Sequence, residues 1–274
     1  MGLQADPRPI GVFDSGVGGL TVLAELRRRL PAESTIYLGD NARAPYGPRP
    51  ADEVRAYTLE SVAWLLAQEV KLLVLACNTA TSQALPLVRQ VADVPVLGVV
   101  RPGAVAAAAS TRAGHIGVIA TAGTVASGAY ATAVGEADPR LVVTQLACPT
   151  LVPMVEAGQL SGPVAEGALR GYLGELFAAD AEIDTLLLGC THYPLLRPLI
   201  EQVAGPLVAV VDSAFTTALA AEDLLDALRA RTPNAGTGAN RIVTTGDVAT
   251  FTAVAGTVFG AALPSVEQAA VTAD

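Results

Sequence analysis

The sequence comprises 274 residues, of which 51% are hydrophobic and only 4% aromatic, and its formal net charge is −9. This length is ample for two domains of ordinary size with aliphatic cores. The negative charge opposes the phosphate neutralisation on which nonspecific nucleic-acid binding depends, so no nucleic-acid partner is expected.

The composition favours a cytoplasmic protein without a membrane partner. Residues 1–9 carry charges and prolines where a secretory signal needs an apolar core. Two windows without charged residues, 113–135 and 248–266, are interrupted by Gly, Ser and Thr, so neither is expected to cross a bilayer. The three cysteines have no Cys-X-X-Cys spacing, which disfavours a disulfide framework or a structural zinc site and favours a reducing cytoplasm.

The first predicted element is a short buried strand over residues 10–13. The Gly-rich turn Asp14-Ser-Gly-Val-Gly-Gly19 follows it, and then a helix that Pro31 ends. A strand, a Gly-rich turn and a helix start leave backbone N–H groups free, which favours anions. Asp14 and Ser15 are expected to face the edge at which open α/β sheets bind ligands. The glycine spacing matches neither the dinucleotide fingerprint nor a Walker loop.

A second predicted strand, over residues 35–39, leads into the polar loop Asp40-Asn-Ala-Arg-Ala-Pro-Tyr-Gly-Pro48. Two prolines stiffen this loop. The Tyr46 hydroxyl and the Gly47 backbone are expected to close over a small polar ligand, although the loop can also be only a turn.

Two later strands end in the same way, in Leu73-Val-Leu-Ala-Cys-Asn-Thr79 and Leu186-Leu-Leu-Gly-Cys-Thr-His192. Each apolar run is followed by a cysteine and by hydrogen-bonding residues at a helix start. Asn78 and Thr79, with the first N–H groups of that helix, are expected to hold a carboxylate.

An ordered internal repeat relates the two halves of the chain. Ile116-Gly-Val-Ile-Ala-Thr121 aligns with Ile10-Gly-Val-Phe-Asp-Ser15, and Thr124 lies at the following helix start. Each half of the chain has a strand ending in a hydroxyl residue, a later strand ending in a cysteine, and a further apolar strand. The repeat predicts an α/β fold of two pseudo-symmetric, three-layer α/β domains with mostly parallel sheets and an active site in the interdomain cleft.

We assign residues 1–98 and 212–274 to the first domain and residues 99–211 to the second. In this division, strands over 241–245 and 266–270 complete the first sheet. Where the chain passes from the first domain to the second, Arg101-Pro-Gly103 is expected to interrupt the secondary structure before an Ala-rich helix over 104–112.

Two thiols on facing domains suit a reaction in which a proton leaves one face of a carbon and another arrives on the opposite face. An unperturbed thiol has a pKa of about 8.5, so modest tuning lets it act as acid or base. The helix start beside each cysteine favours the thiolate. We expect Asp14 to assist Cys77, and Glu156 and His192 to assist Cys190.

Each of these assignments has a structural alternative. A single buried cysteine is more often a small apolar core residue, and Cys148, which lacks the strand-end context, is predicted to be one. His115 precedes a strand and is expected to be solvated, which leaves His192 as the functional histidine. The motifs offer too few ligands for a metal site.

The same residues give the chain a resemblance to the glutamate racemase family from Ile10 to about Gly260. It is carried by the motifs Asp14-Ser-Gly-Val-Gly-Gly, Gly39-Asp-Asn-Ala-Arg-Ala-Pro-Tyr-Gly47, Ala76-Cys-Asn-Thr-Ala-Thr81 and Gly189-Cys-Thr-His-Tyr-Pro194. The resemblance implies an isomerase that interconverts L- and D-glutamate by a two-base mechanism without a cofactor. It also implies that D-glutamate feeds peptidoglycan synthesis, and so cell wall biogenesis and cell shape.

The resemblance further implies roles for individual residues. Cys77 resembles the base for D-glutamate and Cys190 the base for L-glutamate, and Asp14, Glu156 and His192 resemble their acid/base helpers. The residues that resemble substrate-binding positions are Asp14, Ser15, Tyr46, Gly47, Asn78, Thr79, Thr121, Thr124, Thr191 and His192.

Other functions stay open at this point. A related two-cysteine racemase acting on aspartate or another acid would carry the same motifs, because pocket depth is not readable from them. A two-domain amino-acid binding protein is expected to carry a signal peptide and needs no matched thiols. A thiol-redox protein is disfavoured by the missing Cys-X-X-Cys. The expected partner is a small-molecule substrate, and a homodimer is open because the helix at 104–109 can bury its apolar face in a dimer or in the monomer.

Overall fold

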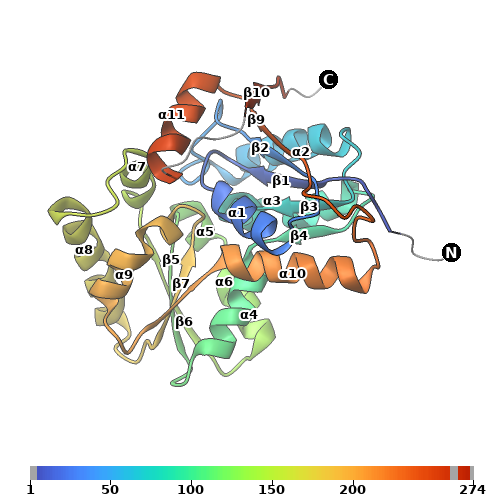
Figure 1. Ribbon diagram of the computed structural model, residues 1–274. Helices are drawn as coiled ribbons and strands as arrows, with labels where there is room; N and C mark the ends of the chain where they lie inside the picture. Colours follow the sequence, from blue (N-terminus) through green and yellow to red (C-terminus); the bar gives the residue numbers. More distant parts are fainter. Residues whose placement is uncertain (1–4, 260–264, 272–274) are drawn as a thin grey trace.

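Two separate parallel sheets form the framework of the protein (Figure 1). The computed structural model describes residues 5–259 and 265–271. Every strand pair in these residues is parallel. The predicted class, α/β with mostly parallel sheets, is therefore confirmed.

The larger sheet has six strands in the order β10-β9-β2-β1-β3-β4. These strands are β1 (Ile10–Asp14), β2 (Thr35–Gly39), β3 (Leu72–Leu75), β4 (Val96–Gly98), β9 (Asn240–Thr244) and β10 (Val266–Gln268). The central strands are completely buried, as expected for a parallel sheet covered on both faces. The two strands expected in the tail do complete this sheet, because β9 pairs with β2 and β10 with β9.

The smaller sheet has four strands in the order β6-β5-β7-β8. These strands are β5 (His115–Ala120), β6 (Val142–Ala147), β7 (Thr185–Gly189) and β8 (Ala209–Asp212). The order repeats the β2-β1-β3-β4 part of the larger sheet, strand for strand. The repeat read from the sequence is thus a repeat of topology, in which β3 and β7 occupy equivalent places.

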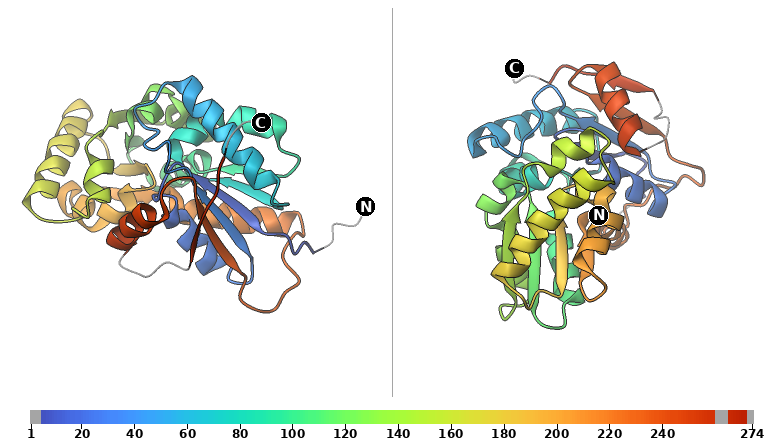
Figure 2. Two further views of the ribbon diagram at one scale, coloured as in Figure 1. Left: turned by 90° about the horizontal axis from the view of Figure 1, so that it is seen from above. Right: turned by 90° about the vertical axis from the view of Figure 1, so that its left-hand side faces the viewer.

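Helices cover both faces of each sheet, so each half has three layers (Figures 1 and 2). The helices of the larger half are α1 (Leu20–Arg29), α2 (Ala51–Leu66), α3 (Asn78–Val91), α10 (Ser213–Ala227) and α11 (Val248–Phe259). Those of the smaller half are α4 (Val100–Ser110), α5 (Ala122–Ala126), α6 (Ala129–Ala137), α7 (Leu151–Glu156), α8 (Pro163–Ala179), the 3-10 helix η1 (Tyr193–Leu196) and α9 (Arg197–Ala204).

One face of the larger sheet packs against α1 and α10, which lie side by side, and the other against α2 and α3. The smaller sheet packs against α4 and α6 on one face and against α7, α8 and α9 on the other. We propose the two domains as residues 1–98 with 212–274 and residues 99–211, because the strands separate in this way. Of the first domain, residues 1–4, 260–264 and 272–274 lie outside the described residues.

Two local predictions were wrong. The segment Arg101-Pro102-Gly103 does not break the chain, because α4 begins at Val100 and includes it. A proline in the first helical turn is tolerated, since its missing N–H would have had no intrahelical acceptor there. His115 is not simply solvated, because its side chain is only 28% exposed and its Nδ1 lies 2.8 Å from Asp180 Oδ2.

Helix α11 reaches both halves of the molecule. Phe251 and Ala255 are buried in the core beneath α1 and α10, whereas Val258 is buried in the core that contains Cys190. A single helix of the chain's last segment therefore contributes to both cores.

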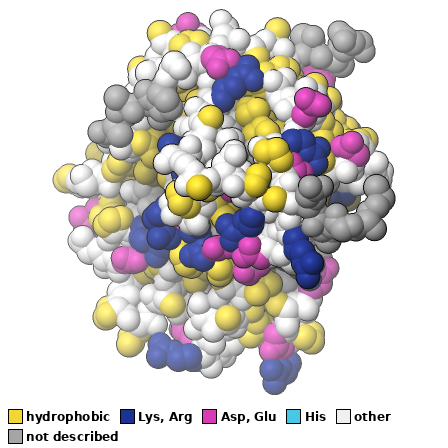
Figure 3. Space-filling view, turned by 45° about the vertical axis from the view of Figure 1, so that its right-hand side comes forward, with side chains coloured by type: hydrophobic (Ala, Val, Ile, Leu, Met, Phe, Trp, Pro, Cys, Tyr) yellow, Lys and Arg dark blue, Asp and Glu magenta, His cyan; other side chains and the backbone are white. Residues whose placement is uncertain are grey.

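On the face seen in Figure 3, Lys/Arg and Asp/Glu side chains are interspersed rather than gathered by sign. Exposed arginines pair with nearby acids, as Arg28 does with Glu25 and Arg231 with Asp226. The described residues on this face form no basic patch of the kind that binds nucleic-acid phosphates. In residues 5–259 and 265–271, no helix combines the length and the apolar character that crossing a bilayer requires.

A buried ion pair closes the amino-terminal edge of the larger sheet. Lys71 Nζ, next to β3, lies 2.6 Å from Glu33 Oε2, and the two side chains are 1% and 2% exposed. The ammonium also donates to the carbonyls of Asp6 and Ala230, at 2.7 and 2.8 Å. One side chain thus joins the start of the chain, the turn after α1 and the segment after α10.

We expect Lys71→Met to lower the free energy of unfolding by about 3–5 kcal/mol, because Glu33 would keep a buried charge without its cation. Urea unfolding followed by circular dichroism measures this loss. The control Arg170→Met removes an exposed pair with Glu166 and should cost at most about 1 kcal/mol. A loss for Lys71→Met no larger than that of the control would contradict the prediction.

Candidate active site

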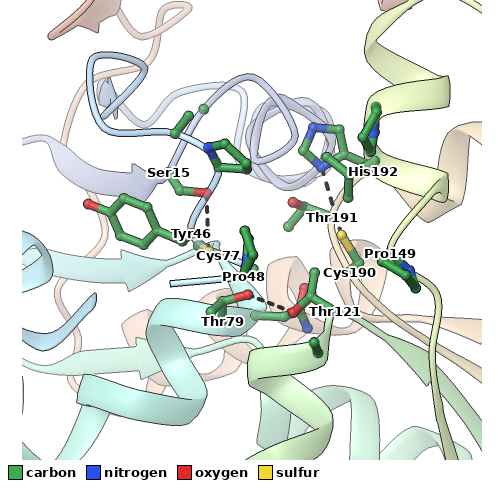
Figure 4. A pocket seen from close by; sticks show the side chains of 18 of the residues that line it. Ser15, Tyr46, Pro48, Cys77, Thr79, Thr121, Pro149, Cys190, Thr191 and His192 are labelled. Atoms are coloured by element: carbon green, nitrogen blue, oxygen red, sulfur yellow. Dashed lines mark hydrogen bonds between the residues drawn. The ribbon is translucent and has the colours of Figure 1, made fainter. Parts of the chain in front are cut away.

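Cys77 and Cys190 stand on opposite sides of one cavity, with Thr79 and Thr121 between them at its base (Figure 4). The carboxyl ends of β3 and β7 carry the two cysteines to this place. The cavity has a volume of about 180 Å³. One water needs only about 10–15 Å³ of such volume, so a small organic molecule fits.

Most of the site residues predicted from the sequence line this cavity. They are Ser15, Tyr46, Gly47, Cys77, Asn78, Thr79, Thr121, Glu156, Cys190, Thr191 and His192. Asp14 and Thr124 do not line it; each is fully buried behind the wall.

Several further residues line the cavity that the motifs do not predict, and they are mostly small or apolar. They are Gly16, Ala44, Pro45, Pro48, Ala122, Cys148, Pro149, Val152 and Pro153. Three of them belong to the loop 40–48, whose prolines were a usable signal. Cys148 is a core residue as predicted, with no exposed surface, yet it also borders the cavity.

Cys77 caps the amino terminus of α3. Its Sγ accepts a hydrogen bond from the Ala80 backbone N–H at 3.4 Å, and its thiol donates to Ser15 Oγ at 3.4 Å. Burial and, next, the charge of Asp14 raise the pKa of the Cys77 thiol to about 12. The helix start and Ser15 oppose this rise without cancelling it, so the thiol form is favoured at neutral pH.

Asp14 ends β1 and has no exposed surface. Its Oδ1 accepts from the Gly16 N–H at 2.8 Å, and its Oδ2 accepts from Thr191 Oγ1 at 3.4 Å. Burial raises the pKa of this carboxyl above its usual range, while His192 acts in the opposite direction. Asp14 therefore touches the Cys190 side through Thr191 and acts on Cys77 through its charge.

Cys190, His192 and Glu156 form a chain of polar groups on the other side. Cys190 Sγ lies 3.8 Å from His192 Nδ1, and His192 Nε2 lies 3.0 Å from Glu156 Oε1. Burial alone would lower the pKa of His192, but its hydrogen bonds to Cys190 and Glu156 outweigh this effect and raise the pKa to about 10. The imidazolium form is thus favoured at neutral pH, next to the sulfur.

The Gly-rich turn after β1 packs directly against Thr191 and His192 on the Cys190 side of the cavity. A Cβ on Gly18 would lie 2.4 Å from Thr191 Oγ1 and 2.5 Å from His192 Nδ1. No side chain fits there without displacing those two groups. The turn's glycine is therefore needed for close approach of the two halves, a role that its sequence pattern did not indicate.

Hydroxyl groups line the base of the cavity between Cys77 and Cys190. Thr79 Oγ1 lies 2.9 Å from Thr121 Oγ1 and 3.4 Å from Thr124 Oγ1. Thr121 also caps α5 through the Thr124 N–H. Asn78 Nδ2 donates to the buried Tyr130 hydroxyl at 2.7 Å.

The Tyr46 hydroxyl does not face the cavity as expected. It donates to the buried carboxylate of Asp40 and points away from the two cysteines (Figure 4). Arg43 and Thr245 also bind Asp40. The ring and backbone of Tyr46 border the cavity, and the hydroxyl fixes the loop from behind.

Among the described residues that line the cavity there is no Lys or Arg, and the charged groups are Glu156 and His192. A ligand carboxylate at this wall depends on hydroxyls, backbone N–H groups at helix starts and the imidazolium. Within the described residues, no group of three or more His, Cys, Asp or Glu is arranged to hold a metal ion.

Comparison with known proteins agrees with this geometry. The sequence profile described as Asp/Glu/Hydantoin racemase matches residues 10–222. A glutamate racemase from Oceanobacillus iheyensis is 48% identical over 252 residues, which cover 92% of this chain and 92% of the relative.

Solved structures give the same result. A glutamate racemase isoform from Bacillus anthracis matches with a TM-score of 0.91 at 42% identity, covering 96% of this chain and 97% of that one. The glutamate racemase from Francisella tularensis, crystallised in complex with D-glutamate, matches with a TM-score of 0.90 at 32% identity, covering 97% and 98%. The resemblance found in the motifs is confirmed: the chain belongs to the Asp/Glu/Hydantoin racemase family and is an amino-acid racemase.

Proposed function

We propose that this protein interconverts L- and D-glutamate by two-base proton transfer at the α-carbon, with Cys77 and Cys190 as the two opposed bases and without a cofactor. The observation that carries the proposal is the opposed position of the two thiols across one small cavity. Glutamate is favoured over other acids by the similarity to glutamate racemases along more than nine-tenths of the chain.

In the L-to-D direction, the Cys190 thiolate removes the α-proton of L-glutamate. The electron pair is left on the α-carbon and is delocalised into the adjacent carboxylate. The Cys77 thiol then donates its proton to the opposite face, which inverts the carbon. Cys190 ends as a thiol and Cys77 as a thiolate, so the reverse reaction begins from that state.

The environments of the two thiols suit this direction in the resting protein. The His192 imidazolium places a positive charge 3.8 Å from Cys190 Sγ. Burial and Asp14 favour the protonated form of Cys77. We assign His192 with Glu156 as the helper of Cys190, and Asp14 as the helper of Cys77.

The polar groups among the lining residues are the ones available to the two carboxylates and the ammonium of the substrate. We assign substrate binding to Ser15, Tyr46, Gly47, Asn78, Thr79, Thr121, Thr191 and His192. Thr124 and Asp14 support this wall from behind, through Thr79 and Thr191 respectively. D-glutamate made in this way would serve peptidoglycan synthesis, and so cell wall biogenesis and cell shape.

The purified protein, without added cofactor, should remove the optical activity of L-glutamate and leave that of L-aspartate nearly unchanged. The physical reason is the extra methylene group of glutamate, which changes where the second carboxylate meets the wall. Polarimetry on a panel of both acids measures this. A larger kcat/KM for aspartate than for glutamate would reassign the substrate.

Cys77→Ala and Cys190→Ala should each lower kcat for racemisation by at least about 10³-fold, because each removes one of the two proton carriers. In D₂O the unmodified protein should place deuterium at the α-carbon, which proton NMR detects. Cys148→Ala is the matched control, since that thiol points toward the Leu146 carbonyl, and it should keep most of the activity. Full activity in either single variant would exclude the two-thiol mechanism.

The L-to-D rate should fall as pH rises through about 10, where His192 loses its proton. Below that pH the imidazolium keeps its positive charge beside the Cys190 sulfur, and Cys77, with a pKa of about 12, still holds the proton that it must donate. His192→Asn should lower the L-to-D kcat at pH 8 by about 10²-fold and abolish this alkaline limb. An unchanged limb in the variant would show that another group causes it.

A further inference from the structure

Gly123, the second residue of α5, is bound on both sides by residues of the larger half. Its N–H donates to the Gly47 carbonyl at 3.0 Å, and its carbonyl accepts from Gln83 Nε2 at 2.9 Å. Gly47 belongs to the loop after β2, and Gln83 to the second turn of α3. Three segments from the two halves thus meet at one residue.

This meeting point adjoins the cavity. Gly47, Thr121 and Ala122 line the cavity, whereas Gln83 does not. The approach is close, because a Cβ on Gly123 would lie 3.0 Å from the Gly47 oxygen and 3.2 Å from Thr79 Cγ2. A small displacement of α5 therefore moves Thr121 away from Thr79 at the base of the cavity.

The contacts around Gly123 differ in how easily they can be replaced. The bond from the Gly123 N–H joins two backbone groups and exists only while the two halves are close. The side chain of Gln83 also reaches from the larger half to the smaller one. The backbone carbonyl of Gln83 accepts a hydrogen bond from Arg55 Nε of α2 at 3.1 Å. Gln83 is thus anchored in the larger half and donates into the smaller one.

We propose that Gln83 is a positioning residue for racemisation: its amide N–H holds the Gly123 carbonyl, and so keeps α5 and Thr121 in place against Thr79 and Gly47 around the substrate. The proposal rests on the proposed function only in its choice of glutamate as the ligand. Gln83 does not contact the substrate, so its loss should weaken binding more than it slows the proton transfers.

Gln83→Leu and Gln83→Glu should raise KM for L-glutamate by about three- to tenfold, the range that one neutral hydrogen bond supports, with kcat changed by less than about twofold. The side chain introduced by Gln83→Glu has the size of glutamine, but as a carboxylate it can only accept hydrogen bonds. The Gly123 carbonyl has no proton to donate to it. Gln83→Lys restores a donor of similar reach and should keep KM within about twofold of the unmodified protein. Gln202→Leu, on the exposed side of α9, is the matched control.

Two results would overturn this role. One is a Gln83→Glu variant with unchanged KM, because the amide would then act only by its size. The other is a fall in kcat at constant KM, because Gln83 would then belong to the chemical step.

Hydrogen exchange of the Gly123 amide, measured without ligand, separates this proposal from the proposed function. The amide should exchange about three- to tenfold faster in Gln83→Leu and Gln83→Glu, and at the original rate in Gln83→Lys and Gln202→Leu. If that pattern is found in a protein that does not racemise glutamate, the proposed function fails and the positioning role stands. If glutamate is racemised and neither exchange nor KM changes, the positioning role fails.

Discussion

The buried carboxyl group of Asp14 is the constraint on which the two sides of the site depend. It lies at the end of the central strand β1 and accepts a hydrogen bond from Thr191 of the other half. Its negative charge raises the pKa of Cys77 and also favours the cationic form of His192. One charge therefore disfavours a thiolate on one side and supports a cation on the other. Because burial raises its own pKa, uptake of a proton by Asp14 would weaken both effects together and couple the two proposed half-reactions.

Close packing between the halves is the second requirement, and glycines provide it. Gly18 lies where any side chain would strike Thr191 and His192, and Gly123 lies against the Gly47 carbonyl. The Gly18 contact lies beside Cys190, and the Gly123 contact lies beside Gly47 and Thr79 of the larger half. They let backbone and short hydroxyl side chains, rather than long cationic ones, form most of the polar surface that faces the cavity.

The features that sequence could predict are those that each strand carries by itself. Apolar runs ending in Cys77 and Cys190 identify β3 and β7, and the repeat gives them equivalent places in two parallel sheets. The Tyr46 hydroxyl, Asp14 and Cys148 were harder, because their surroundings depend on contacts between distant segments. The Tyr46 hydroxyl binds Asp40 beneath the loop, and Asp14 is covered by the Gly-rich turn. Cys148 borders the cavity because it follows β6, which pairs with β5, and β5 in turn pairs with β7. The break predicted at Pro102 is wrong because the sequence pattern alone does not locate the first turn of α4.

The strand order of the larger sheet has a consequence for synthesis. β9 covers one edge of β2, yet about 200 residues separate the end of β2 from the start of β9. At about 5–20 residues per second, a ribosome needs roughly 10–40 s to make that stretch. Throughout this interval the backbone groups along the free edge of β2 have no strand to pair with, while the whole four-stranded half can already form. The nascent chain is therefore exposed to unwanted edge pairing until β9 emerges, and a chain truncated before Asn240 would retain that open edge permanently.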